Sequence, residues 1–235
     1  MCSLYGKNNF NNNKNCMDCK NVVGDFLAYL GNYLDINPKI YELISPMLQV
    51  RELVKNEVIV NEGEICREAF WLQAGYGRYF KIITDENGVG HDQTIDFCKP
   101  GRFLFVSGSF FDESISEFGF ELSAGSIIIP FTKNDYDSLI QRCPEVATIA
   151  NKILVLDKFE VIRKMDMMKI KPRERYREFL ILFEADIEQY FAIKHIANNL
   201  GLQPSYLSRL RGEFRKKKSG LTKYLQIVFI TLHFI

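Results

Sequence analysis

The sequence of 235 residues lacks several features that mark common classes of protein. It holds only three histidines, and no stretch reaches the roughly 20 apolar residues that a membrane-spanning helix needs. Its first residues are polar and rich in asparagine, without the apolar centre of a secretory signal peptide. These absences predict a cytoplasmic protein that has no membrane segment.

The cysteines do not form the pattern of a metal centre. Cys16 and Cys19 make one CxxC pair, whereas zinc and iron–sulfur sites need about four ligands. Cys66, Cys98 and Cys143 stand alone in segments with the character of regular structure, where cysteine usually packs as a small hydrophobic residue. We therefore expect free thiols and no bound metal.

Charge is balanced over the whole chain but not along it. The formal net charge is only +1, which argues against a general binder of polyanions. Between positions 203 and 218, however, basic residues far outnumber acidic ones. The basic residues there are Arg209, Arg211, Arg215, Lys216, Lys217 and Lys218, and the acid is Glu213. A local excess of this kind suits contact with phosphate groups.

Residues 193–212 have the spacing of two short helices that cross at a turn. Apolar side chains recur where the two helices must bury them, at Ile196, Leu200, Leu202, Leu207 and Leu210. Ala197 would let the second helix approach closely, and Gly201 would end the first helix in the left-handed conformation that glycine adopts most readily. Since the outer positions of the second helix are polar or basic, the pattern predicts a DNA-binding helix-turn-helix rather than an ordinary helical hairpin.

The chain before this motif changes its periodicity several times. Residues 1–20, rich in Asn and Lys, predict a flexible tail. Two short helices are expected between residues 21 and 48, the second starting at Asn37 and Pro38. From 50 to 129, short apolar runs alternate with glycine turns, which predicts a small antiparallel barrel or sandwich. A short helix over 135–142, capped by Thr132 or Asn134, follows.

A long helix without glycine or proline is predicted over residues 145–169, and another helix over 173–185. The long helix carries two apolar stripes, one with Val146, Ile149, Ile153 and Leu156 and the other with Val155, Phe159 and Ile162. Two apolar faces need two partners. We expect these partners to be the barrel and the same helix of a second chain. A helix buried within one protomer is the alternative.

In this order the segments resemble the Crp/Fnr family of bacterial transcription regulators over about residues 25–216. The resemblance rests on VIVNEGE at 58–64, WLQAG at 71–75, DENG at 85–88, PGRF at 100–103, HIA at 195–197 and LSR at 207–209. The last segment is similar to regulators of a Bacteroidetes-like branch.

The resemblance implies an α+β fold with a jelly-roll-like antiparallel β-roll and flanking helices. It assigns residues 21–143 to a cyclic-nucleotide-binding-like sensor domain, 144–170 to a dimerisation helix and 171–218 to the DNA-binding domain. It also implies a homodimer that reads a two-fold site on double-stranded DNA, and leaves RNA polymerase open as a further partner.

The sequence departs from family members that bind cyclic AMP. Those members carry a Gly-Glu pair after the glycine that matches Gly101, and then an arginine for the cyclic phosphate. Here Phe105 and Val106 stand at the Gly-Glu positions, and no arginine occurs between Phe103 and Gln141. A phosphate would meet acidic and apolar side chains without a cation, which is unfavourable when partly buried. We expect no binding of cyclic AMP and no cofactor.

Two interpretations of the roll interior stay open. One is an uncharged or apolar small-molecule effector held against Gly101, Phe103, Phe105, Val106 and Phe110. The other is that these side chains simply fill the barrel, as is normal in small barrels. The family's oxygen sensors hold an iron–sulfur cluster through N-terminal cysteines, but the third N-terminal ligand of that set is missing here.

The predicted DNA-binding residues lie on the outer side of the second helix and just beyond it. Arg209 is the candidate for a bidentate contact with guanine. Gln203 suits an adenine or a phosphate, and Ser205 suits a phosphate at the helix N-terminus. The full set is Gln203, Ser205, Tyr206, Ser208, Arg209, Arg211, Arg215 and Lys216, of which the last three would mostly contact phosphates.

Other classes of function fit less well. A cupin-like enzyme would need two or three histidines around a metal, and only His91 lies in the expected barrel. A non-enzymatic signalling or protein-binding module with a degenerate helix-turn-helix is the second alternative. It rests on residues 219–235, an atypical apolar tail at the place where the family often has a β-hairpin wing.

Overall fold

The computed structural model describes residues 15–184 and 186–215, with side chains from residue 21 onward. The chain divides into two units, one up to Asp166 and one from Met167, and each is described by itself. A helix begins at Asn15, so the tail expected over residues 1–20 is too long at its C-terminal end. Residues 1–14, Lys216 and the tail of residues 219–235 lie outside the described residues.

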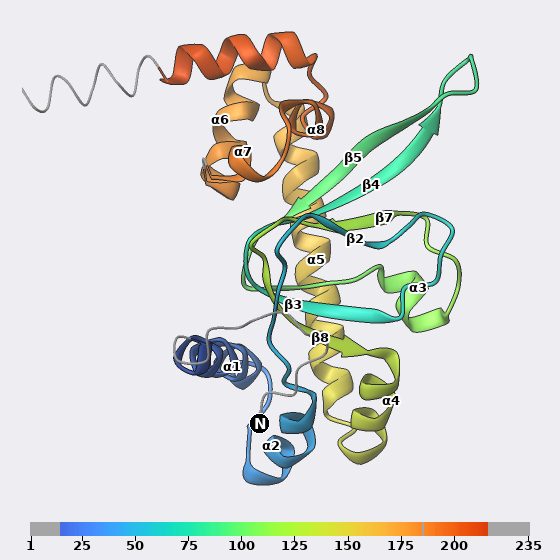
Figure 1. The fold of residues 1–235 in the computed structure, drawn as a ribbon, viewed down its shortest axis with the longest axis vertical. Helices are drawn as coiled ribbons and strands as arrows, with labels where there is room; N and C mark the ends of the chain where they lie inside the picture. Colours follow the sequence, from blue (N-terminus) through green and yellow to red (C-terminus); the bar gives the residue numbers. More distant parts are fainter. Residues whose placement is uncertain (1–14, 185, 216–235) are drawn as a thin grey trace, which may run out of the picture. The chain divides into compact units, whose positions relative to one another are not determined.

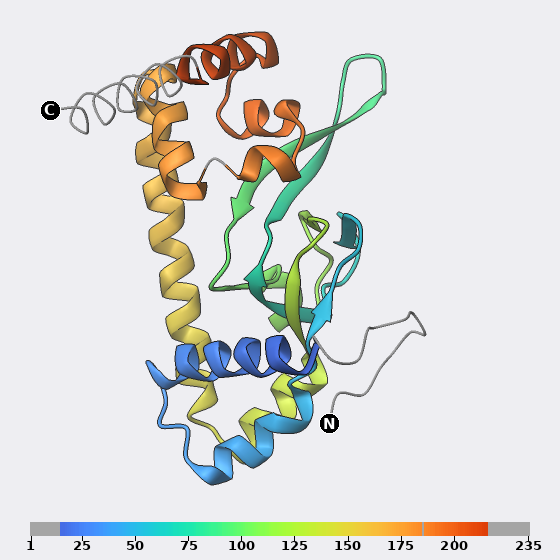
Figure 2. The ribbon, with the colours of Figure 1, turned by 60° about the vertical axis from the view of Figure 1, so that its left-hand side comes forward.

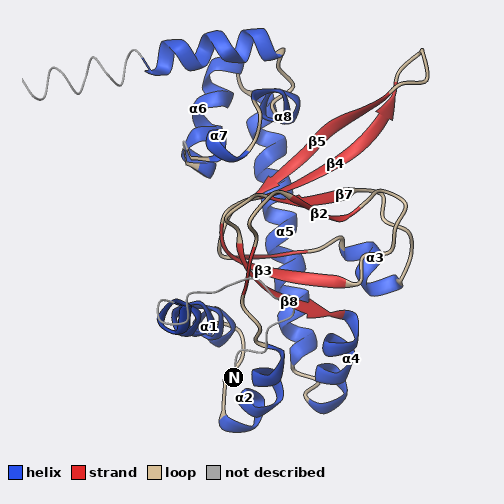
Figure 3. Ribbon diagram, in the orientation of Figure 1, coloured by secondary structure: helices blue, strands red, loops and turns tan. Residues whose placement is uncertain are grey.

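Two antiparallel sheets of four strands form the centre of the first unit (Figures 1 and 3). The first sheet has the order β1 (Arg51–Glu52), β8 (Ile127–Thr132), β3 (Glu68–Ala74) and β6 (Arg102–Leu104). The second has the order β2 (Glu57–Val60), β7 (Gly119–Leu122), β4 (Gly77–Thr84) and β5 (Gly90–Cys98). These sheets confirm the predicted antiparallel β-roll.

Among the described residues of the first unit, the structure adds three short elements that periodicity did not predict. They are β1, β6 and the helix α3 (Ser107–Asp112). Strands of two or three residues have too few positions to show alternation between apolar and polar side chains. Segment β1 is a strand because it pairs with β8, and β6 is a strand because it pairs with β3.

Short helices cover one end of the roll, as Figure 2 shows for α1 (Asn15–Gly31), α2 (Pro38–Ile44) and α4 (Lys133–Arg142). A single turn, η1 (Ser45–Met47), follows α2.

The predicted helix caps are present. The side chain of Asn37 accepts a hydrogen bond from the Ile40 amide at 3.1 Å, and Thr132 forms a capping box with Asp135. Thr132, rather than Asn134, is therefore the residue that caps α4.

The long helix α5 (Val146–Lys169) matches the prediction within one residue at its start. Ile149 and Ile153 are buried in a core shared with α1, α2, α4 and the first sheet. Beyond Ile153 the inner side of the helix becomes polar. Asp157 pairs with Arg102 of β6, and Lys164 pairs with Asp96 of β5, each at 3.0 Å.

The predicted inner apolar stripe of α5 was therefore wrong at its last member, since Leu156 is 39 % exposed instead of buried.

Across the residues that the structure describes, no helix combines the length and hydropathy required to cross a membrane.

Candidate nucleic-acid interface

The second unit carries the described part of the predicted DNA-binding residues, on or next to a set of short helices. They are α6 (Pro172–Phe183), α7 (Ile187–Tyr190), α8 (Ile193–Asn199) and a helix over residues 204–215 that follows α8 after a turn. Helix α6 ends before the predicted residue 185, because Glu184 adopts a positive φ of 59°.

The core of this unit is largely the set expected from the spacing. Ile196, Ala197, Leu200 and Leu207 are fully buried, and Leu210 is nearly so. Leu202 is the exception and is half-buried. Each fully buried leucine or isoleucine contributes roughly 1.5–3 kcal/mol to stability. This burial fixes which side of helix 204–215 faces inward, so its outer side is a defined surface.

The turn between the two helices has the predicted glycine geometry. Gly201 has a φ of +61°. The Leu202 amide donates to the Ala197 carbonyl at 2.9 Å, and the Gly201 amide donates to the Asn198 carbonyl at 3.0 Å. This pair of hydrogen bonds is the Schellman motif, which satisfies carbonyls at the end of α8.

The same turn is stabilised by an arginine, Arg175, that was not predicted from the sequence. The guanidinium of Arg175 donates to the carbonyl of Leu200 at 2.6 Å. It also donates to the carbonyls of Met168 at 2.7 Å and Ile170 at 3.1 Å, at the end of α5. One side chain of α6 thus satisfies carbonyls at the ends of two other helices, where backbone acceptors lack partners.

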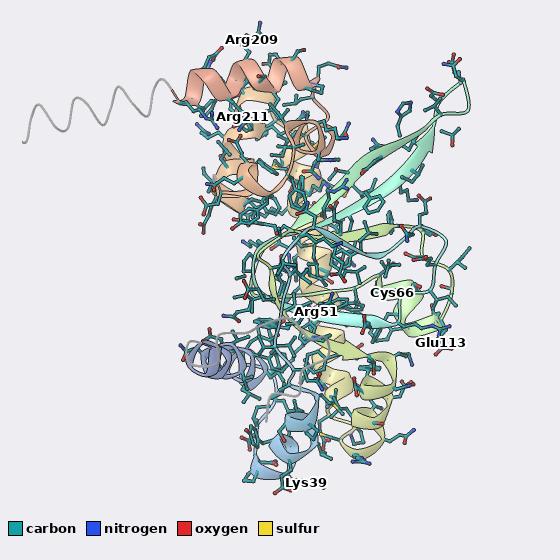
Figure 4. The ribbon with its side chains drawn as sticks, in the orientation of Figure 1. Lys39, Arg51, Cys66, Glu113, Arg209 and Arg211 are labelled. Atoms are coloured by element: carbon teal, nitrogen blue, oxygen red, sulfur yellow. The ribbon has the colours of Figure 1, made fainter. Side chains whose placement is uncertain are left out.

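The outer side of helix 204–215 is polar and accessible. Gln203, Ser205, Ser208 and Arg209 are exposed, and Tyr206 is half-buried. The Arg209 guanidinium lies over the Tyr206 ring, 5.0 Å from its centre. Such cation–π stacking limits the rotamers of Arg209 while leaving its N–H groups accessible. Figure 4 shows Arg209 on the side of the helix opposite to Arg211.

Arg211 and Arg215 are placed differently from Arg209. The Nε atom of Arg211 lies 2.9 Å from Oε1 of Glu188, and Nη2 of Arg215 lies 3.6 Å from Oε2 of the same residue. Both arginines belong to the predicted phosphate contacts. Their ion pairs with an acid of α7 had no signal in the sequence, since Glu188 lies outside the predicted motif.

Of the predicted effector-pocket residues, Val106 and Phe110 lie in one apolar core, and Phe103 and Phe105 pack against it, but their ring contacts differ. The ring of Phe103 packs with Phe26, Tyr29, Trp71 and Phe131, at centroid distances between 5.8 and 6.2 Å. Phe105 and Phe110 belong instead to a cluster of four rings. Its members are Phe105, Phe110, Phe111 and Tyr136, with centroids 5.3 to 5.8 Å apart.

The two other predicted pocket residues have structural partners. Gly101 is exposed, has a φ of +82°, and donates its amide to the Leu72 carbonyl at 2.8 Å. Val106 is buried, and its amide contacts the Cys66 sulfur at 3.5 Å.

Tyr79 holds the backbone of Phe105 in place. Its hydroxyl donates to the Phe105 carbonyl at 3.0 Å and accepts from the Phe105 amide at 3.1 Å. Burial raises the pKa of Tyr79 well above its ordinary value, so the hydroxyl keeps its proton and remains a donor. The position of Tyr79 within a predicted strand gives no sign of this role.

Other polar groups of the roll are also paired. Arg78, which is buried, contacts Asp92 at 2.6 Å and Glu121 on neighbouring strands. Burial raises the pKa of Asp157, and the nearby Arg102 opposes that shift. Within residues 15–184 and 186–215, no group of three or more His, Cys, Asp and Glu side chains is placed to hold a metal ion.

A cavity of about 530 Å³ is lined by Phe110 of the four-ring cluster and by residues outside that cluster. Ile59, Ile65, Cys66 and Phe110 form its apolar part, and Lys133 and Glu113 are among its polar residues. Figure 4 shows Cys66 and Glu113 in this region. Apart from Phe110, the predicted effector residues do not line it.

Comparisons with known proteins give fold likeness only. No protein-family model matches the sequence, and no curated protein matches it. A solved structure from Eubacterium rectale, assigned to the Crp/Fnr family of transcriptional regulators, is similar with 20 % identity and a TM-score of 0.57. The match covers 79 % of this chain and 88 % of that one.

Two further solved structures show the same likeness. FixK2 from Bradyrhizobium japonicum has 19 % identity and a TM-score of 0.54, over 72 % of this chain and 85 % of that one. The regulator CLP of Xanthomonas campestris, described as responsive to c-di-GMP, has 11 % identity and a TM-score of 0.53, over 77 % and 93 %. The chain therefore has the fold of the Crp/Fnr transcription regulators.

Proposed function

We propose that this protein is a transcription regulator that binds double-stranded DNA sequence-specifically through helix 204–215, and that it is not an enzyme. One observation carries the proposal. The inner side of this helix is buried, while its outer side exposes Ser205, Ser208 and Arg209, and Gln203 is exposed directly before its first residue. These are side chains that hydrogen-bond to base edges and phosphates, and a helix presenting them can enter a major groove.

We propose that the regulator acts as a homodimer through α5. Val155, Phe159 and Ile162 are 53, 64 and 44 % exposed, and their spacing puts them on one side of the helix. An exposed apolar stripe on a long helix is suited to pairing with the same stripe of a second copy. Two copies would present two reading helices to half-sites about 34 Å apart.

We also propose that cyclic AMP is not the effector. Phe105 occupies the place of the glycine found in relatives that bind it, and Tyr79 bonds both backbone groups of Phe105. The serines of the following segment are bonded within the protein, with Ser109 donating to the Ser114 carbonyl and Ser116 to the Phe118 carbonyl. A cyclic phosphate would have to displace these bonds without gaining a cation.

The proposal is tested by selecting binding sequences from a random DNA library with the full-length protein. We expect a two-fold site, bound roughly 10³-fold or more tightly than random DNA at physiological salt. Adding cyclic AMP should leave that affinity unchanged. Recovery of no preferred sequence would instead favour the signalling or protein-binding module.

The role of Arg209 is tested on the selected site. Arg209→Ala should cost about 1–3 kcal/mol and relax the preference at one base pair in each half-site. Arg177→Ala, which removes an exposed arginine of α6, is the matched control and should leave the base preferences intact. Equal losses on selected and random DNA for Arg209→Ala would refute its role as a base-reading residue.

A further inference from the structure

A carboxylate is buried against the inner side of the proposed reading helix. The side chain of Glu188, on α7, is only 9 % exposed. Its Oε1 accepts a hydrogen bond from the hydroxyl of Tyr176 on α6 and lies 2.9 Å from Nε of Arg211. Its Oε2 lies 3.6 Å from Nη2 of Arg215. An acid so far removed from water is stable only when paired and hydrogen-bonded, and Glu188 has both kinds of partner.

The partners of Glu188 come from the basic stretch that is best suited to phosphates. A phosphate contact adds affinity for every DNA sequence, whereas a base contact distinguishes sequences. Each arginine that Glu188 holds therefore contributes less to binding random DNA. The two arginines are positioned unequally, since the side chain of Arg211 is 22 % exposed and that of Arg215 is 71 % exposed.

The same contacts oppose rotation of helix 204–215 about its axis. Successive residues of a helix differ by 100°, so a modest rotation would move Arg209 away from a base edge. Glu188 ties the C-terminal half of this helix to α6 and α7. Two further contacts act with it, namely the Tyr176 and Phe214 rings at 5.4 Å and the Arg173–Glu213 ion pair at 2.9 Å.

We infer that Glu188 is a positioning residue that sets the specificity of DNA binding, by holding Arg211 and Arg215 away from phosphates and by fixing the orientation of helix 204–215. Glu188 itself touches no DNA. The inference rests on the proposed function, because it concerns how well the protein distinguishes its site from random DNA.

The test is Glu188→Gln in the full-length protein, with affinity measured on the selected site and on random DNA over a range of salt concentrations. The amide oxygen still accepts from Tyr176, but the charge is gone. We expect random DNA to be bound more tightly, with a salt slope steeper by about 1–2, because each newly made phosphate contact adds about 0.9. The ratio of selected to random affinity should fall by about tenfold or more, the size of one lost base contact.

Two controls separate this result from a general charge effect. Glu178→Gln removes the same charge from α6, at a residue paired with its neighbour Arg177, and should leave the affinity ratio unchanged. Arg211→Gln should lower the affinity for random DNA only in the Glu188→Gln background, because only there is Arg211 released to a phosphate.

The outcomes distinguish a failure of the role inferred for Glu188 from a failure of the proposed DNA-binding function. If Glu188→Gln changes both affinities by the same factor, Glu188 is merely structural and the inference is overturned. If the unmodified protein shows no preferred site, the proposed function itself fails. Should Glu188→Gln not fold, Glu188→Asp keeps the charge but shortens its reach, and the ratio should fall in the same direction by a smaller factor.

Discussion

At the scale of single residues, Gly201 decides where α8 ends. Its φ of +61° lies in the left-handed region, which a side chain makes costly. A Cβ at this position would also lie 3.2 Å from Cε of Met168 and 3.6 Å from Nη1 of Arg175. The backbone conformation and the neighbouring side chains therefore both favour glycine.

We predict that Gly201→Ala lowers the free energy of unfolding by about 1–2 kcal/mol, the cost of a side chain in the left-handed region. Denaturant unfolding measures this change. Gly212→Ala is the matched control, because Gly212 lies within helix 204–215 and its added Cβ would meet no atom within 4 Å. That control should be neutral or stabilising by up to about 1 kcal/mol. Equal destabilisation by both substitutions would contradict the argument.

At the scale of elements, Tyr79 joins β4 to the segment between β6 and α3. That segment is short and has little regular hydrogen bonding of its own, so the two bonds from one hydroxyl to Phe105 hold it in place. Removing the hydroxyl would leave a backbone donor and a backbone acceptor without this partner. An unpaired buried polar group costs about 1–3 kcal/mol.

We predict that Tyr79→Phe lowers the free energy of unfolding at neutral pH by about 1–3 kcal/mol. The pKa of Tyr79 is raised in the folded state, so the stability it contributes is present below the unfolded-state value of about 10 and is lost as pH rises above it. The variant should therefore lose less stability than the unmodified protein between neutral and strongly alkaline pH. Tyr41→Phe, at an exposed tyrosine of α2, should change neither quantity.

At the scale of the whole molecule, the proposed dimer depends on the exposed stripe of α5. Phe159 is its most exposed member. Phe159→Glu would bury a charge without a partner in the interface, which should weaken the dimer by about 2–5 kcal/mol. Sedimentation equilibrium should then show monomers at concentrations where the unmodified protein is dimeric.

The control for this prediction is Ile181→Glu on α6, a similarly exposed apolar residue outside the stripe. It should leave the protein dimeric. Because a monomer reaches only one half-site, Phe159→Glu should also weaken binding to the selected two-fold site while its thermal unfolding stays close to that of the control. Monomers in the unmodified protein would remove the basis for a two-fold site.

Local chemistry explains why the elements were predictable from sequence. Short apolar runs between glycine turns identify β3 and β4, Asn37 and Thr132 are capping residues, and Gly201 marks a helix end, each within a few positions of the structure it produces. The buried positions of residues 193–212 follow from helical spacing for the same reason.

The sequence by itself thus determined the antiparallel roll, the long helix and the two crossed helices of the second unit. Only the tertiary structure decided which distant side chains meet. It gave Phe103 other ring contacts than Phe105 and Phe110, paired Arg102 with Asp157 55 positions away, and placed Glu188 against Arg211. Caps and periodicities act over one or two turns of chain, whereas these contacts depend on how whole elements pack, which no short window of sequence contains.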